Sequence, residues 1–343
     1  MSDYSALDRL LHRLALGNQT IMELCFELEG MVVRPSVIPN PAVLVTGLAR
    51  SGTTALVRAL HRSGEFSSLT YDDMPFLLAP NLWSKLVKLS RKKRTKKQRA
   101  HGDGIMVDFD SPEAFEEVFW RLQTGIDYAK RELKPHTVSN EALRKYRQYQ
   151  NMICQKYGGD RYLAKNNNLV LRIASLAPRC PDSIFVVIFR NPLRQSLSLL
   201  HQHRKFIAVD KFTKNYMTWL AHHEFGVTHR QFRLSRHLTD DPRPDNREYW
   251  LRQWVEVYEY LWMQLSSNNN NILAVSYERL CQQPRYWDAL CDRLKVSRSQ
   301  CVFRESNRYE DDATEIDSEL LKKVTKLYYD LDRFALSLTG GKT

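Results

Sequence analysis

Two glycines and two threonines stand close together in the run VLVTGLARSGTTAL (residues 43–56), a pattern suited to binding an anion. Gly47 and Gly52 have the spacing of a phosphate-binding loop, and Thr53 and Thr54 close it. Glycines let the backbone curl so that successive amides converge on one anion, and the N-terminus of a following helix adds about half a positive charge. This loop is therefore expected to bind a phosphate-bearing ligand.

The loop lacks the lysine that ATP- and GTP-binding loops carry. In those loops the lysine reaches the β- and γ-phosphates, and a hydroxyl group holds Mg²⁺. Here Thr53 occupies the lysine position, and Arg50 supplies a cation from inside the loop. We therefore expect a shorter anion at this loop, and no metal ion.

A second candidate anion site follows the apolar run FVVIF, in the segment FVVIFRNPLRQSLS (residues 185–198). Arg190 leaves the carboxyl end of a predicted central strand, which is where α/β sheets bind ligands. Pro192 suits the first turn of the next helix, and Ser198 lies two turns further along it.

These motifs resemble those of sulfotransferases that use 3′-phosphoadenosine 5′-phosphosulfate (PAPS), and the RSGTT form of the loop is similar to that of tyrosylprotein and many bacterial sulfotransferases. The segments SYERLCQQP (residues 276–284) and YLAKNNN (residues 162–168) also resemble segments of that family. Asn191 departs from the aspartate usual in the family. The resemblance implies these donor-binding residues: Gly47, Arg50, Ser51, Gly52, Thr53 and Thr54 for the 5′-phosphosulfate, Arg190 and Ser198 for the 3′-phosphate, and Tyr277 near the adenine.

The resemblance also implies catalytic residues. Lys165 would contact the oxygen that bridges the donor phosphate and the sulfuryl group, assisted by Arg50. A base must take the proton of the acceptor, and in relatives with this loop it is often an acid shortly after the first helix. Asp73 is favoured over Asp72 for that role, and His101 is the rival, because a histidine is better suited to base chemistry at neutral pH.

Other acids and histidines receive structural interpretations. Glu113, in the segment SPEAFEE (residues 111–117), is interpreted as an acid near the positive end of a helix that begins there. His222 and His223 lack a third ligand at metal-binding spacing, so they are expected on a packed helix.

Short apolar strands alternate with helical patterns, which predicts a right-handed parallel sheet with helices on both faces. The expected fold is a three-layer α/β P-loop fold with an N-terminal helical segment (1–40), a sulfotransferase-like domain (41–343) and an acceptor-side helical insert (about 74–160) without strands. The predicted strands cover residues 42–46, 66–71, 161–166, 183–191 and 271–278, and the predicted helices cover residues 4–30 with a break at Gly17, 53–64, 168–177, 193–204 and 250–266.

The composition is that of a globular protein: 343 residues, 43% of them hydrophobic, with a formal net charge of +12 that favours anionic partners. The six cysteines show no metal-binding spacing, so reduced thiols are expected. No signal peptide and no apolar run of about 18 residues is present, so a cytoplasmic protein without a membrane span is expected.

Two other function classes remain open at this point. A small-molecule or nucleotide kinase would need a metal-binding acid and usually the loop lysine. A nucleic-acid-binding protein would use the basic tract RKKRTKKQR (residues 91–99), although that tract has no interleaved aromatics and no nucleic acid is expected. The acceptor, whether small molecule, lipid, carbohydrate or peptide, and the oligomeric state do not follow from the sequence.

Overall fold

The computed structural model describes residues 5–33, 40–89, 97–98, 106–107, 112–125, 132–235, 243–267, 270–298, 301–305 and 316–340. His101 and most of the basic tract 91–99 lie outside these residues. The roles predicted for them therefore stay predictions.

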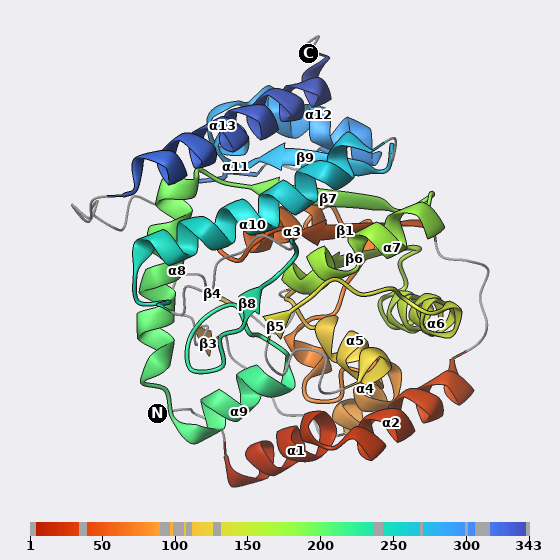
Figure 1. Ribbon diagram of the computed structural model, residues 1–343. Coiled ribbons are helices and arrows are strands. Elements are labelled where there is room, and N and C mark those ends of the chain that lie inside the picture. Colours follow the sequence, from red (N-terminus) through yellow and green to blue (C-terminus); the bar gives the residue numbers. More distant parts are fainter. Residues whose placement is uncertain are drawn as a thin grey trace.

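A parallel sheet of five strands forms the centre of the molecule, in the order β2-β6-β1-β7-β9 (Figure 1). Each pairing is parallel, and β1 lies in the middle. Its strands are almost wholly buried, as expected for apolar runs covered on both faces. The predicted α/β class is confirmed, with these bounds: β1 (Asn40–Thr46), β2 (Phe66–Ser67), β6 (Arg161–Lys165), β7 (Ile184–Phe189) and β9 (Ile272–Ser276).

Helices flank this sheet. Helix α3 packs on β1, β2 and β6, and α6 packs on β2 and β6, while α10 and α13 pack on β9. The helices named here and below are α1 (Ala6–Gly17), α2 (Gln19–Val32), α3 (Thr53–His61), α4 (Pro80–Leu89), α5 (Glu117–Thr124), α6 (Asn140–Tyr157), α7 (Ile173–Leu176), α8 (Pro192–Ile207), α9 (Lys211–Trp219), α10 (Arg247–Ser266), α11 (Tyr277–Gln282), α12 (Pro284–Leu294) and α13 (Ser318–Ala335).

The structure corrects two predicted strand ends and the prediction that region 74–160 lacks strands. The strand predicted over 66–71 ends at Ser67, because the hydroxyl of Thr70 caps a turn of 3-10 helix over Tyr71–Asp73. The last strand ends at Ser276, so Tyr277 opens a helix. The region 74–160 was expected to lack strands, yet it contains three of two residues each, which are too short to leave a period in the sequence: β3 (Lys97–Gln98), β4 (Met106–Val107) and β5 (Glu132–Leu133).

The N-terminal helices pack on the insert and on α9. Helix α1 contacts α9, and α2 contacts α4, α5 and α6. The predicted break at Gly17 is confirmed, since α1 ends there and the side chain of Asn18 caps the start of α2. Among the described residues, no helix is both long enough and apolar enough to cross a membrane.

Acid is expected to destabilise the fold through His229, which packs against the rings of His203 on α8 and Trp250 on α10. Nδ1 of His229 lies 3.1 Å from the carbonyl oxygen of His223, which can only accept, so Nε2 accepts from the hydroxyl of Tyr249 at 2.6 Å. Burial lowers the pKa of His229 to about 3, against an unfolded value of about 6.5. The folded state thus binds fewer protons, and stability is lost as the pH falls from 6.5 towards 3.

This single histidine accounts for about 2 kcal/mol of lost stability at pH 5. Denaturant unfolding at pH 7.5 and pH 5 should show this loss in the free energy of unfolding of the wild type. The loss should be smaller in the His229→Gln variant. Substitution of the exposed His201 by Gln is the control and should leave the difference unchanged. An equal loss in His229→Gln and the wild type would contradict this assignment.

Candidate active site

The loop between β1 and α3 has the curled backbone that its glycines predict. Gly47 has φ 145° and Gly52 has φ 101°, and Arg50 between them also has a positive φ of 71°. A Cβ atom at Gly47 would lie 2.3 Å from the carbonyl oxygen of Ile188, and one at Gly52 would lie 2.2 Å from the ring of Tyr277. Both positions therefore require glycine, for backbone conformation and for space.

The two predicted anion sites meet at the middle of the sheet. Nε of Arg50 in the loop donates to Oγ of Ser198 on α8 at 3.0 Å. Arg190, one residue beyond β7, lies with its guanidinium carbon 5.7 Å from the ring centroid of Tyr277. Because β1 and β7 are neighbours, the loop after β1 and the residues after β7 share one sheet edge. The structure thus brings together Arg50, Ser198, Arg190, Tyr277 and the loop glycines.

Gln195 supports the loop, a role that the sequence reading missed. Its Nε2 donates to the carbonyl oxygens of Leu48 at 3.1 Å and Ala49 at 2.9 Å. Nε1 of Trp254 donates in turn to Oε1 of Gln195 at 3.1 Å. The only clue in the sequence is that Gln195 falls on the face of α8 that points inward.

Asn191, which replaces the family's usual aspartate, caps α8. Its Oδ1 accepts from the backbone N–H of Arg194 at 3.2 Å, and its own backbone N–H donates to Glu278 at 3.0 Å. Pro192 is the first residue of the helix, as predicted. Asparagine and aspartate are both favoured helix caps, so Asn191 can perform the capping role that an aspartate would perform here.

Lys165, at the end of β6, forms a buried ion pair with Glu113. Nζ of Lys165 lies 2.7 Å from Oε1 of Glu113, and both side chains are more than nine-tenths buried. The strand register pairs Lys165 with Val45 on β1, which places the lysine next to the start of the phosphate loop. An acid and a lysine buried together beside an anion-binding loop are a combination typical of active sites.

The prediction that Glu113 lies at a helix start was wrong. Helix α5 begins at Glu117, four residues later. Pro112 instead forms an antiparallel bridge with Thr70, and the backbone N–H of Glu113 donates to the carbonyl of Leu69 at 3.4 Å. This bridge brings residues 112–117 against the segment that follows β2 and directs them towards β6.

Two further acids fix this segment. Glu116 accepts from the hydroxyls of Tyr146 at 2.7 Å and Tyr162 at 3.0 Å. Glu117 forms a two-fold ion pair with Arg172, with both distances 2.7 Å. Nδ2 of Asn166, the residue after Lys165, donates to both acids. These contacts join the residues just after Glu113 to the residue just after Lys165, and so fix the position of Glu113 relative to Lys165.

Asp73, the favoured base in the sequence reading, is fully buried and lies in a different network. Its carboxylate accepts from Lys156, from the hydroxyl of Tyr157 at 2.7 Å and from the backbone N–H of Thr70 at 2.7 Å. Burial and the nearby Asp73 charge raise the pKa of the Tyr157 hydroxyl, which therefore stays a donor. Asp72 belongs to the same 3-10 turn and is partly exposed.

The prediction that His222 and His223 lie on a packed helix was wrong, because α9 ends at Trp219 and Ala221 has a positive φ of 52°. His222 instead donates from Nε2 to the carbonyl of Ala114 at 2.9 Å, next to Glu113. This turn therefore lines the same region as the Lys165–Glu113 pair.

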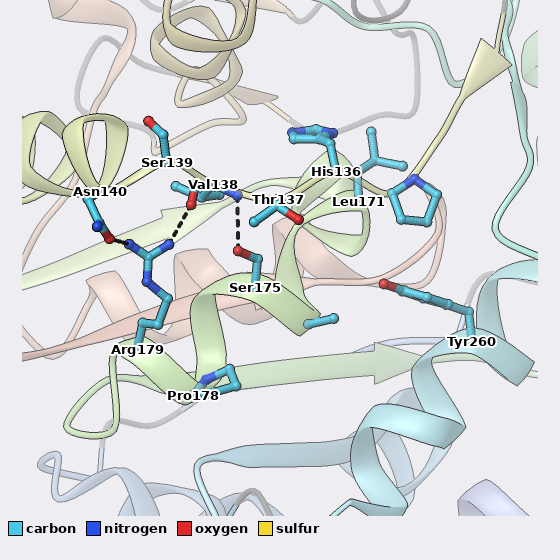
Figure 2. A pocket seen from close by; sticks show the side chains of 12 residues that line it. His136, Thr137, Val138, Ser139, Asn140, Leu171, Ser175, Pro178, Arg179 and Tyr260 are labelled. Carbon is cyan, nitrogen blue, oxygen red and sulfur yellow. Dashed lines mark hydrogen bonds between the residues drawn. The ribbon is translucent and has the colours of Figure 1, made fainter.

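A cavity of about 740 Å³ lies elsewhere, between the segment 135–140, α7 and Tyr260 of α10 (Figure 2). None of the predicted donor-binding residues lines it. Figure 2 shows Arg179 bridging Val138 and Asn140 at one end. The cavity is therefore separate from the site formed by the loop and the ion pair.

The fold and the site define a class: an α/β protein whose central parallel sheet carries a glycine loop, a buried arginine after β7 and a buried lysine–glutamate pair at one edge. A family model described as "Sulfotransferase family" matches residues 41–300, and the chain belongs to that family.

The solved structures to which the chain is similar include two mycobacterial sulfotransferases. The chain is 14% identical to sulfotransferase STF1 from Mycobacterium tuberculosis H37Rv, with a TM-score of 0.46 and coverage of 96% of this chain and 87% of that one. It is 12% identical to sulfotransferase STF9 from Mycobacterium avium, with a TM-score of 0.47 and coverage of 99% and 84%. No curated protein matches the chain.

Proposed function

We propose that this sulfotransferase moves a sulfuryl group from PAPS to a hydroxyl or amine of its acceptor. The observation that carries the proposal is the 3.0 Å hydrogen bond from Arg50 to Ser198, because it joins the phosphate loop to the second anion site. A donor with phosphate at both ends of one nucleoside needs two such sites side by side.

The residues present suit this donor. The loop amides between Gly47 and Gly52, with Arg50 and the hydroxyls of Ser51, Thr53 and Thr54, would hold the 5′-phosphosulfate. Arg190 and Ser198 would hold the 3′-phosphate, and the ring of Tyr277, which packs on Gly52, would lie by the adenine. The transferred group carries less charge than a γ-phosphoryl group, so the proposal involves no metal.

Lys165 and Glu113 are the proposed reacting side chains. The acceptor oxygen forms its bond to sulfur as the bond from sulfur to the donor's phosphate oxygen breaks. Lys165 stabilises the negative charge that develops on the departing oxygen, and Glu113 takes the proton of the acceptor. Positioning and charge stabilisation dominate such a transfer. The buried Lys165–Glu113 pair would supply a fixed position for the acceptor and a positive charge for the departing oxygen.

The geometry favours Glu113 over Asp73 as the base. Glu113 contacts Lys165 directly, whereas Asp73 already accepts from three donors in a fully buried network. Asp72 and His101 remain the other candidates.

We also place the reaction in the cytoplasm. All six cysteines are unpaired thiols in the structure, and structural disulfides are rare in that compartment.

Calorimetry with adenosine 3′,5′-bisphosphate and with ATP plus Mg²⁺ tests the donor. The bisphosphate should bind about 10–150-fold more tightly, since ATP lacks the 3′-phosphate and one charge-assisted contact is worth about 1.5–3 kcal/mol. Tighter binding of ATP with Mg²⁺ would instead support a kinase. Binding of a single-stranded oligonucleotide but not of the bisphosphate would support a nucleic-acid-binding protein.

A further inference from the structure

The N-terminal helices expose a row of large apolar side chains. Their buried residues, among them Leu16 and Phe26, face the body of the molecule. The opposite faces carry residues that are between 40% and 80% exposed, namely Leu7, Leu10, Leu14, Leu24, Leu28 and Met31. Figure 1 shows α1 and α2 following one another along the lower edge of the molecule. On each helix the three residues span about 10 Å, and monomeric proteins rarely expose large contiguous apolar patches.

The spacing of the row is symmetric in sequence about Gln19, the first residue of α2. Leu14, Leu10 and Leu7 lie five, nine and twelve positions before Gln19. Leu24, Leu28 and Met31 lie five, nine and twelve positions after it. A two-fold axis through the junction would therefore place α1 of one chain antiparallel to α2 of another, with each apolar residue of α1 opposite one of α2.

The charges beside the row are complementary under the same operation. Helix α1 presents the exposed Arg13, and α2 presents the exposed Glu23 and Glu27. In the two-fold arrangement Arg13 of one chain falls between Glu23 and Glu27 of the other. Among the described residues, Gln19 donates to Glu23, and Lys145 lies 3.8 Å from Glu27.

We propose that α1 and α2 form a homodimer interface, in which the occupant of the apolar row is the same row of a second copy. In such an isologous contact the same surface of each chain meets its copy, so the assembly is complete at two chains. An anionic membrane is the less suitable occupant, because the exposed charged residues of the two helices carry no net positive charge: Asp8, Glu23 and Glu27 are acidic, and Arg9 and Arg13 are basic. The interface leaves the sheet edge with the phosphate loop outside the contact.

Analytical ultracentrifugation tests the proposal. The wild type should sediment with twice the chain mass of 40.3 kDa at micromolar concentration. The double variant Leu10→Glu/Leu24→Glu should raise the dissociation constant at least about 100-fold, because it places four charges in the dimer core. Met263→Glu, at a similarly exposed apolar residue of α10, is the matched control and should remain a dimer.

Charge reversal tests the register. Arg13→Glu should weaken the dimer about 10-fold, and adding Glu23→Arg and Glu27→Arg should restore it, whereas no restoration would overturn the antiparallel arrangement. A wild type that stays monomeric at 100 μM would overturn the proposal. A monomer that floats with vesicles containing phosphatidylserine would assign the row to a membrane instead.

Discussion

Replacement of Glu113 by glutamine is expected to lower turnover about 10²–10⁴-fold, the range that a positioned general base contributes. Glutamine keeps the shape of the side chain and can still accept from Nζ of Lys165, which lies 2.7 Å from Glu113. It cannot take a proton from the acceptor. The affinity for adenosine 3′,5′-bisphosphate should stay within about two-fold, because the donor-binding residues are untouched.

Release of adenosine 3′,5′-bisphosphate from PAPS, measured with a panel of phenols, alcohols, saccharides and amines, supplies the assay. Asp73→Asn is the matched carboxylate variant. It should lower the free energy of unfolding by about 1–3 kcal/mol, because it weakens the buried contacts to Lys156 and Tyr157, yet the folded protein should retain turnover.

The opposite pattern of activities would contradict the assignment of Glu113 as the base. If Asp73→Asn or Asp72→Asn abolishes turnover with donor affinity intact while Glu113→Gln stays active, the base is an acid of the 3-10 turn. If only His101→Ala does so, the base is the histidine. Thermal melts of every variant separate these outcomes from a failure to fold.

The sequence predicted the parts of the site that depend on local geometry. The spacing of Gly47 and Gly52 forces one loop conformation, and the arginine after a buried strand must emerge at the sheet edge. Both motifs lie within a few residues of the strand that positions them. Their proximity to each other then follows from the neighbouring positions of β1 and β7 in the sheet.

The lysine–glutamate pair could not be predicted in this way. Glu113 and Lys165 are 52 positions apart, and their contact depends on the bridge between Thr70 and Pro112. A run of acids after a proline has the same local pattern as a helix start, which is how SPEAFEE was interpreted. The partners of Asp73 could not be predicted either, because Lys156 and Tyr157 come from the C-terminal end of α6, more than 80 positions away.

Replacement of Arg190 by alanine is expected to weaken binding of adenosine 3′,5′-bisphosphate about 30–150-fold, which corresponds to about 2–3 kcal/mol for a lost charge-assisted contact. Arg190 is 7% exposed, so its interaction with a phosphate is little screened by solvent. The loss should largely vanish for adenosine 5′-phosphosulfate, which lacks the 3′-phosphate. Calorimetry with the two ligands measures the difference.

Arg194→Ala is the matched control for this prediction. Arg194 belongs to the same helix, but its side chain is about half exposed and pairs with Glu305. Its removal should change the affinity for either ligand less than two-fold, as expected for an exposed ion pair. Arg190 also packs on the ring of Tyr277, so its removal could disturb the adenine contact as well as the phosphate contact. That disturbance would weaken the binding of both ligands equally. Equal losses of affinity would therefore place Arg190 outside the 3′-phosphate site. A loss confined to the bisphosphate would assign Arg190 to the 3′-phosphate.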